Sequence, residues 1–255
     1  MVVFFYDKTF EGLLTCVFEA YWLKRFPDNL LNENEIPPLF SNEQYHIYSD
    51  KTKAERVWKG LEKKLSQSAL NEIATCWFAD SYEKVDELLF RYIRKAIDAP
   101  QSIELNFGDA DVLELQRVWK QVKWERTRVM QFARFQKASD GTYFAPFEPV
   151  HNVLPLAVAH FKDRFADQKF LLFDMKRHYG LYYDLHSVEE ITFSDEESNL
   201  GNGKLDINAL AEDEILFQNL WKTYFKAICI KERMNPRKHK QDMPVRYWKY
   251  LTEKG

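Results

Sequence analysis

The sequence has few of the residues that usually form recognisable chemical motifs. Its 255 residues include eight glycines, and these are scattered along the chain. There is no GxGxxG turn and no P-loop, which excludes nucleotide binding by these two routes. GxSxG, HExxH and DxDxDG patterns are also absent, which excludes enzymes that depend on those spacings. The residues therefore predict a fold class and a site region, but no reaction.

Cysteine is equally scarce. Cys16, Cys76 and Cys229 are far apart, odd in number and without CxxC spacing. This pattern favours neither a disulfide framework nor a zinc site, and it predicts a reducing cytoplasmic location with no bound metal or cofactor. The N-terminal MVVFFYDKTF has no basic segment before its apolar run, so it predicts a first strand and no signal peptide. No apolar run reaches the ~20 residues of a membrane helix.

The charge is unevenly distributed, although the net value is only -3. Residues 116–137 contain seven Lys or Arg and one acid, and residues 221–255 contain ten Lys or Arg and three acids. Residues 187–214 contain nine acids and one lysine. A near-neutral total can therefore hide two basic surfaces.

Hydrophobic periodicity predicts helices separated by short strands. Strands are expected at Val2–Tyr6 and Tyr45–Ser49, with Thr9 capping the helix that follows the first. Residues 27–41 and 187–203 are polar and predict loops. Further helices are expected over 51–65, 71–97, 111–131 and 213–231.

The helix over 111–131 has the clearest apolar stripe, and one acid interrupts it. Glu125 occupies a stripe position where an apolar residue is expected. A buried, unpaired carboxylate costs several kcal/mol, so we expect Glu125 to bond to an arginine such as Arg128 or Arg134. A tuned acid or base is the alternative interpretation.

Residues 132–184 predict two hairpins around one helix. Asp140-Gly141 is a two-residue turn signal between strands Phe132–Ala138 and Thr142–Glu148, in a register that places Arg134 opposite Phe147. Asn152 is expected to cap the helix. Phe170–Phe173 and Leu181–Tyr183 form the second hairpin.

Two groups of polar residues are candidates for function. His151 and His160 near the helix could be metal ligands or proton shuttles, although such a pair is more often structural. Basic residues interleaved with Trp and Tyr suit phosphate contacts with base stacking, or are simply solvated. The candidate nucleic-acid-binding residues are Arg117, Arg128, Arg134, Arg164, Arg237 and Arg246. The weaker catalytic candidates are His160, Asp174 and Arg177.

These residues also form a recognisable pattern. FxRF at 132–135, DGxYxAxxEPxHNVLPLxxxHFxxRFxDQ at 140–168 and the strand ending in YYD at 184 resemble a bacterial family without assigned activity, associated with DNA repair and DNA metabolism. The opening TFEGLLTCVFEAY and the tail NPRKHKQDMPVRYWKYLTE resemble it as well. The family's shared positions fall on Glu125, Arg128, Arg134, Asn152, His160, Arg164, Asp174 and Arg177.

The resemblance implies partners and no established chemistry. Members of that family tend to be encoded beside a radical-SAM protein, and some related chains are fused to a uracil-DNA-glycosylase-like domain. This chain has no CxxxCxxC cluster and no glycosylase motif, so neither activity is assigned to it.

The sequence predicts an α+β protein with a small antiparallel sheet, two hairpins around a helix and helices packed outside. We expect a strand–helix region over 1–108 and the family core with a basic tail over 109–255. The leading hypothesis is a cytoplasmic accessory protein that contacts DNA weakly and acts with the radical-SAM enzyme. An enzyme acting on damaged DNA, and an interaction partner without DNA binding, remain alternatives. No membrane partner is expected.

Overall fold

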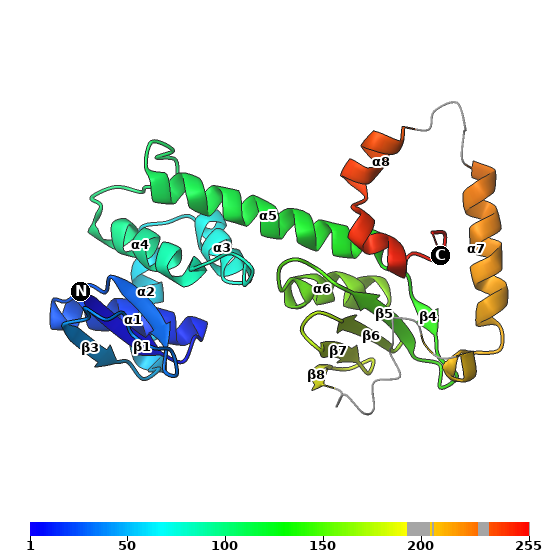
Figure 1. The fold of residues 1–255 in the computed structure, drawn as a ribbon, viewed down its shortest axis with the longest axis horizontal. Helices are drawn as coiled ribbons and strands as arrows, with labels where there is room; N and C mark the ends of the chain where they lie inside the picture. The colour runs from blue at the N-terminus through cyan, green and yellow to red at the C-terminus, as the bar shows by residue number, and fades with distance from the viewer. Residues whose placement is uncertain (193–204, 206, 229–234, 255) are drawn as a thin grey trace. The chain divides into compact units, whose positions relative to one another are not determined.

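The apolar run at the N-terminus forms the central strand of a small parallel sheet (Figure 1). Strand β1 (Val2–Tyr6) lies between β2 (Asn29–Asn32) and β3 (Glu43–His46), and both pairings are parallel. Four of its five residues are buried, as expected of a parallel strand covered on both faces. Strand β2 lies within the segment predicted to be a loop, so that prediction is wrong; its four residues are ordered by pairing with β1.

One helix lies between β1 and β2 in the sequence, four more follow β3, and several begin at a capping side chain. They are α1 (Phe10–Leu23), α2 (Lys51–Glu62), α3 (Gln67–Cys76), α4 (Val85–Asp98) and α5 (Ala110–Phe132). Thr9 caps α1 as predicted, because its side chain accepts a hydrogen bond from the Gly12 N–H. Asp50 and Ser66 cap α2 and α3 in the same way.

This computed structural model describes residues 1–192, 205, 207–228 and 235–254. The chain divides into two compact units, Met1–Lys123 and Trp124–Gly255, so the division falls within α5. None of the described helices has the length and hydropathy needed to cross a membrane.

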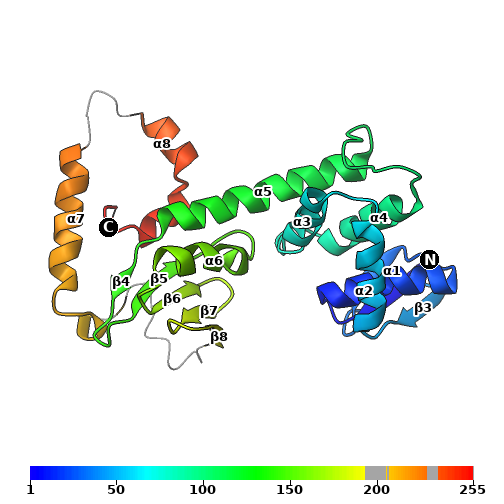
Figure 2. The ribbon, with the colours of Figure 1, turned by 180° about the vertical axis from the view of Figure 1, so that it is seen from behind.

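The second unit is built on a five-stranded sheet, in the order β4-β5-β6-β7-β8 (Figures 1 and 2). The strands are β4 (Gln136–Lys137), β5 (Tyr143–Phe147), β6 (Phe170–Asp174), β7 (Tyr179–Tyr183) and β8 (Val188–Thr192). Helix α6 (Leu154–Arg164) connects β5 to β6. Because of this crossover β5 and β6 are parallel, whereas the other neighbours are antiparallel. The α+β class is confirmed, and the sheet is mixed where an antiparallel one was expected.

The first hairpin forms, but it is shorter and shifted by one residue. Phe132 ends α5, and β4 contains only two residues. Lys137 pairs with Tyr143, so Ser139, Asp140 and Gly141 form a three-residue loop. Gly141 has φ of 85°, the left-handed conformation that closes such a loop. The predicted pairing of Arg134 with Phe147 is therefore wrong.

The second hairpin is confirmed, with Phe170 opposite Tyr183 in the β6–β7 pair. The acidic segment after it was predicted to be a loop, but Val188–Thr192 forms β8 against β7. The remainder of that segment, 193–203, lies outside the described residues. After it come the 3-10 helices η2 (Ile207–Ala209) and η4 (Val245–Tyr250), with α7 (Glu214–Ile228) and α8 (Pro236–Asp242) between them.

Phenylalanine side chains fill the space between α6 and the sheet. Phe161 on α6 is 1% exposed, and its ring contacts those of Phe147 on β5 and Phe170 on β6. Phe135, which follows α5, packs edge-on against Phe161 and Phe165. This aromatic core holds the end of β6 beside the turn that precedes α6, which positions the polar groups described below.

Candidate functional site

The second unit contains a buried polar network centred on Glu125. The stripe of α5 continues through Val118, Val122 and Val129, which are fully buried, and Glu125 replaces an apolar residue between the last two. Its residue exposure is 2%, which confirms the predicted burial. A carboxylate at this depth is stable only if its oxygen atoms are saturated with donors.

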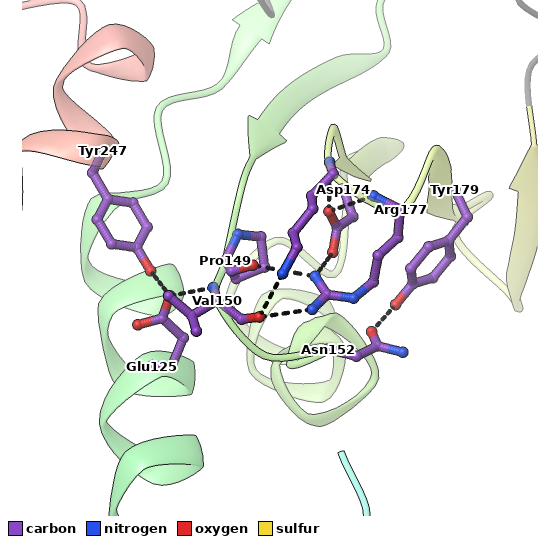
Figure 3. Close-up of polar contacts among 9 residues, drawn as sticks. Glu125, Pro149, Val150, Asn152, Asp174, Arg177, Tyr179 and Tyr247 are labelled. Atoms are coloured by element: carbon purple, nitrogen blue, oxygen red, sulfur yellow. Dashed lines mark hydrogen bonds and ion pairs between the residues drawn. The ribbon is translucent and has the colours of Figure 1, made fainter. Parts of the chain in front are cut away.

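Four groups donate hydrogen bonds to the Glu125 carboxylate, and Figure 3 draws two of them, the Val150 N–H and the Tyr247 hydroxyl. Oε1 accepts from the Val150 N–H and the Tyr247 hydroxyl, both at 2.8 Å. Oε2 accepts from Nη2 of Arg246 at 2.5 Å and from Nη1 of Arg128 at 3.3 Å. The predicted arginine partner is confirmed, but the shorter bond comes from Arg246 near the end of the chain.

These donors determine the protonation of Glu125. Burial alone would raise the pKa of its carboxyl group. The Val150 N–H, the Tyr247 hydroxyl and the Arg246 guanidinium outweigh that effect and hold the pKa below its usual value. Tyr247 changes in the opposite direction, because burial and the adjacent carboxylate raise the pKa of its phenol. Glu125 is therefore an ionised acceptor, which favours the structural interpretation over a tuned acid.

A second buried carboxylate lies at the end of β6. Asp174 is fully buried, and its Oδ2 accepts from Nη1 of Arg177 at 2.7 Å. Its Oδ1 accepts from the Lys176 and Arg177 N–H groups at 2.9 and 3.1 Å, which closes the tight β6–β7 turn. Burial raises the pKa of Asp174, and the Arg177 guanidinium acts against that increase.

Both carboxylates act on the same short segment, Pro149–Asn152, which we call the 149–152 turn (Figure 3). Glu125 binds the N–H of Val150. Arg177 donates to the Pro149 and Val150 carbonyls at 3.2 and 2.9 Å, and Nζ of Lys176 donates to the Val150 carbonyl at 3.1 Å. The backbone of this turn is therefore fixed through its N–H group by Glu125 and through its carbonyl groups by Arg177 and Lys176.

Asn152 completes this arrangement in an unexpected way. Its Oδ1 accepts a hydrogen bond from the Tyr179 hydroxyl on β7. The N-cap of α6 is Val153, which makes no side-chain capping bond, so the predicted cap at Asn152 is wrong. His151 lies in the same turn and is 6% exposed. His160 is half-buried on α6, with its ring against Phe161.

The candidate nucleic-acid-binding arginines are mostly engaged with carboxylates. Arg117 pairs with Glu114 at 3.1 Å, and both Arg128 and Arg246 bind Glu125. Arg134 binds Glu253 through Nη2 at 2.6 Å and Nε at 3.1 Å, and the Glu253 side chain is fully buried. The candidates Arg164 and Arg237 are exposed. Arg233, part of the predicted basic tail, lies outside the described residues.

Tyr247 and Glu253 belong to this network, although sequence patterns gave them no specific role. Tyr247 is separated from Glu125 by 122 residues, and Glu253 is separated from Arg134 by 119 residues. No local periodicity connects positions so far apart. Two signals pointed to the tail: its family resemblance, which gave no residue a role, and its basic and aromatic composition, which was interpreted as a surface for nucleic acid.

The chemistry available to this network is recognition and positioning. Among the described residues, no three His, Cys, Asp or Glu side chains group in a way that could hold a metal ion. The weak catalytic candidates Asp174 and Arg177 bind each other, and Arg177 also binds the 149–152 turn. The arrangement therefore fixes the backbone of the 149–152 turn without presenting a free acid or base from Glu125 or Asp174.

A separate open pocket of about 600 Å³ lies in the first unit, beside α4. Arg91, Arg94 and Lys95 line it. Each is paired: Arg91 and Lys95 with Asp111 at 2.9 and 2.7 Å, and Arg94 with its helical neighbour Asp98 at 3.6 Å. The positive charge of this pocket is therefore neutralised locally.

The network lies within a region that matches a known family. Residues 83–253 match the family described as a domain of unknown function, DUF4130, and the chain belongs to it. None of the curated proteins matches the sequence. Among solved structures, the pGpG-specific phosphodiesterase PggH from Vibrio cholerae is similar at 11% identity, with a TM-score of 0.36, over 89% of this chain and 98% of that one. A likeness at this level supports no inference about activity.

Proposed function

We propose that this chain is a DNA-metabolism accessory protein that contacts nucleic acid through its C-terminal basic segment, residues 235–254, and acts with a separately encoded radical-SAM enzyme. The observation that carries the proposal is the state of Arg237 and Lys240 on α8. Both are exposed, and neither forms an ion pair within the described part of the chain. Six Lys or Arg and two acids occupy the segment.

The segment is attached to α5 at one end, while Arg237 and Lys240 at the other end stay exposed to a ligand. Arg246 and Tyr247 bind the buried Glu125, which attaches the segment to α5. Asn235 caps α8 by accepting from the Lys238 N–H, which orders the part that carries the free cations. A surface already ordered before binding loses less conformational entropy when it meets a phosphate backbone.

Aromatic rings accompany these cations. The Trp248 ring lies 5.6 Å from that of His239, and Nζ of Lys254 lies 5.1 Å from the Trp248 centroid. Half-buried aromatic rings beside cations are the groups that bind single strands, through phosphate contacts and base stacking. Single-stranded or damaged DNA is therefore expected to bind at least as well as intact duplex.

The test is fluorescence anisotropy with labelled single-stranded, duplex and damaged oligonucleotides across a salt series. We expect a Kd of about 10⁻⁴–10⁻⁶ M that weakens steeply with salt. Arg237→Glu combined with Lys240→Glu should weaken binding alike for all sequences and reduce the salt slope by about 2. Lys169→Glu, an exposed cation elsewhere in the same unit, is the control. Charge reversal at Arg128 is less informative, because it also disturbs Glu125.

Two outcomes would replace the proposal with the alternatives. If the chain binds no DNA at low salt but co-elutes with the radical-SAM enzyme, it is an interaction partner only. If the chain alone converts damaged oligonucleotides, and His160→Ala abolishes turnover while leaving DNA affinity intact, it is an enzyme in its own right.

A further inference from the structure

Helix α7 leaves nearly all of its apolar surface uncovered. The only buried residue of its fifteen is Glu214, at the N-terminal end. Seven large apolar side chains are between 39% and 59% exposed: Ile215, Leu216, Phe217, Leu220, Trp221, Tyr224 and Ile228. An amphipathic helix normally packs such a stripe against a hydrophobic core. Within the described part of the chain, no hydrophobic surface covers the stripe of α7.

The helix is nevertheless attached to its own unit. Glu214 accepts from the Lys137 N–H, and Nε1 of Trp221 donates to Glu253. Nζ of Lys254 lies 5.5 Å from the Phe225 ring. These contacts fix the N-terminal end and one side of α7, and they leave the apolar arc through Leu216, Leu220 and Tyr224 facing outward.

We propose that the apolar face of α7 is a homodimer interface, in which two copies of the chain pack their α7 helices antiparallel about a two-fold axis. The exposed area supports a protein partner. Six of the seven side chains share one arc of the helix, and Ile215 lies on the opposite side. With each of the six exposing roughly 100 Å², the face covers on the order of 600 Å². That is at the upper end of the ~300–600 Å² of the largest apolar patch on a typical monomer and about three quarters of the ~800 Å² that each partner buries in a standard interface.

The pattern of the face favours a second copy of the same helix. Leu216, Leu220, Tyr224 and Ile228 repeat every four residues along the whole length of α7, and Phe217 and Trp221 widen the stripe. At 3.6 residues per turn this arc is self-complementary when one helix is reversed. Aromatic residues are also enriched at protein interfaces.

The charges of α7 agree with this arrangement. At 100° per residue, Lys222 and Lys226 lie on the side of the helix opposite the apolar arc. Two copies packed through the arc would therefore keep their lysines apart and in water. A nucleic-acid surface would need cations within the arc, and there are none in α7.

Sedimentation equilibrium of the full chain tests the interface. We expect a dimer that persists at about 1 M NaCl, because burial of apolar surface is not screened by salt. Leu220→Glu and Tyr224→Glu should each weaken dimerisation at least ~10-fold while leaving the circular dichroism spectrum unchanged, since both residues are more than half exposed. Leu39→Glu, at a 96% exposed apolar position of the first unit, is the control and should dimerise normally.

Cross-linking tests the antiparallel order. In a Cys229→Ser background, we expect a mixture of Leu220→Cys and Tyr224→Cys chains to form mixed disulfides faster than either chain forms them with itself. Predominant self-cross-linking of both the Leu220→Cys chain and the Tyr224→Cys chain would indicate parallel helices. A monomer at all concentrations, a dimer unaffected by Leu220→Glu, or sedimentation of the monomer with phosphatidylglycerol vesicles through α7 would each overturn the proposal.

Discussion

Glu125 receives its hydrogen bonds from three separate places in the sequence. Arg128 lies on the same helix, Val150 precedes α6, and Arg246 and Tyr247 lie near the C-terminus. A buried carboxylate with these partners adds little net stability compared with an apolar residue, but removing its charge leaves the partners uncompensated. Its role is to select one arrangement of the three segments.

Replacing this charge should therefore weaken the second unit. Glu125→Gln is expected to lower its free energy of unfolding by about 2–3 kcal/mol at pH 7, less than for a fully buried pair because Arg128 and Arg246 are partly exposed. Hydrogen exchange of the β6–β7 amides measures the loss within this unit. The control, Asp242→Asn, breaks the exposed pair with Lys238 and should change the value by less than about 0.5 kcal/mol. Equal losses in both variants would contradict the special status of Glu125.

A second prediction concerns how the free energy of unfolding of wild type and of Glu125→Gln depends on pH. Glu125 has a pKa below its unfolded value of about 4.3, so its contribution is fully present above that pH. As pH falls below about 4.3, the unfolded state binds the proton first, and the contribution is lost as the pH passes through the folded pKa. The stability difference between wild type and Glu125→Gln should therefore narrow in acid. Asp174, whose raised pKa acts in the opposite direction, is present in both proteins and cancels. A difference that stays constant down to pH 3 would contradict this assignment.

At the scale of elements, the short loop between β4 and β5 depends on one backbone conformation. Gly141 has φ of 85°, and an added Cβ there would meet no atom within 4 Å. Gly60, inside α2, has similarly open space and no positive φ. The same substitution at these two glycines therefore tests the backbone alone, without steric contacts.

Gly141→Ala should destabilise the hairpin by about 1 kcal/mol, because alanine is strained in the left-handed region. Gly60→Ala should stabilise its unit by about 0.5–1 kcal/mol, since alanine suits a helix interior. Thermal unfolding and hydrogen exchange of each variant check the signs. Stabilisation by Gly141→Ala would show that the loop does not need the left-handed conformation.

Elements with strong local signals were predictable, whereas elements defined by distant partners were not. The run Val2–Tyr6 and the stripe of α5 follow from periodicity. Strands β2 (NLLN) and β8 (VEEIT) mix polar and apolar residues, and they are ordered by pairing with β1 and β7. The Asp140-Gly141 signal located the turn, but a three-residue loop shifts the pairing register by one residue from the predicted one.

The same distinction applies to the candidate site. The burial of Glu125 follows from its place in a stripe, but its partners Arg246 and Tyr247 are 121 and 122 residues away. Asn152 has the composition of a cap, yet the hydroxyl of Tyr179 engages its side chain. Four of the six arginines interpreted as a nucleic-acid surface form ion pairs with carboxylates, because sequence shows the sign of a charge and not what neutralises it.

At the scale of the whole molecule, residues 246–253 connect to the first residues of the second unit through buried and partly buried hydrogen bonds. Arg246, Tyr247 and Glu253 bind Glu125 and Arg134, which lie at the start of that unit. A chain ending after Pro244 loses all three and leaves the Glu125 carboxylate without two of its four donors.

The truncated chain should therefore lose protection from hydrogen exchange in α5 after Lys123 and around the 149–152 turn. Protection of the β1–β3 sheet, which belongs to the first unit, should be unchanged. The control is the full chain carrying Glu125→Gln, which should lose protection in the same segments to a smaller extent. Uniform loss over both units would show that they do not unfold separately.

The long separation between Glu125 and its partners also has a consequence during synthesis. A ribosome adding about 5–20 residues per second makes Arg246 on the order of 10 s after Glu125. During that interval residues 1–123 are already complete, while the carboxylate of Glu125 has neither Arg246 nor Tyr247 to bind it. The first unit can therefore fold on the nascent chain, whereas Glu125 in the second unit lacks two of its donors until Arg246 and Tyr247 have emerged. Any product of interrupted translation would carry an open second unit, exposing to proteases and chaperones the aromatic side chains that the finished protein encloses.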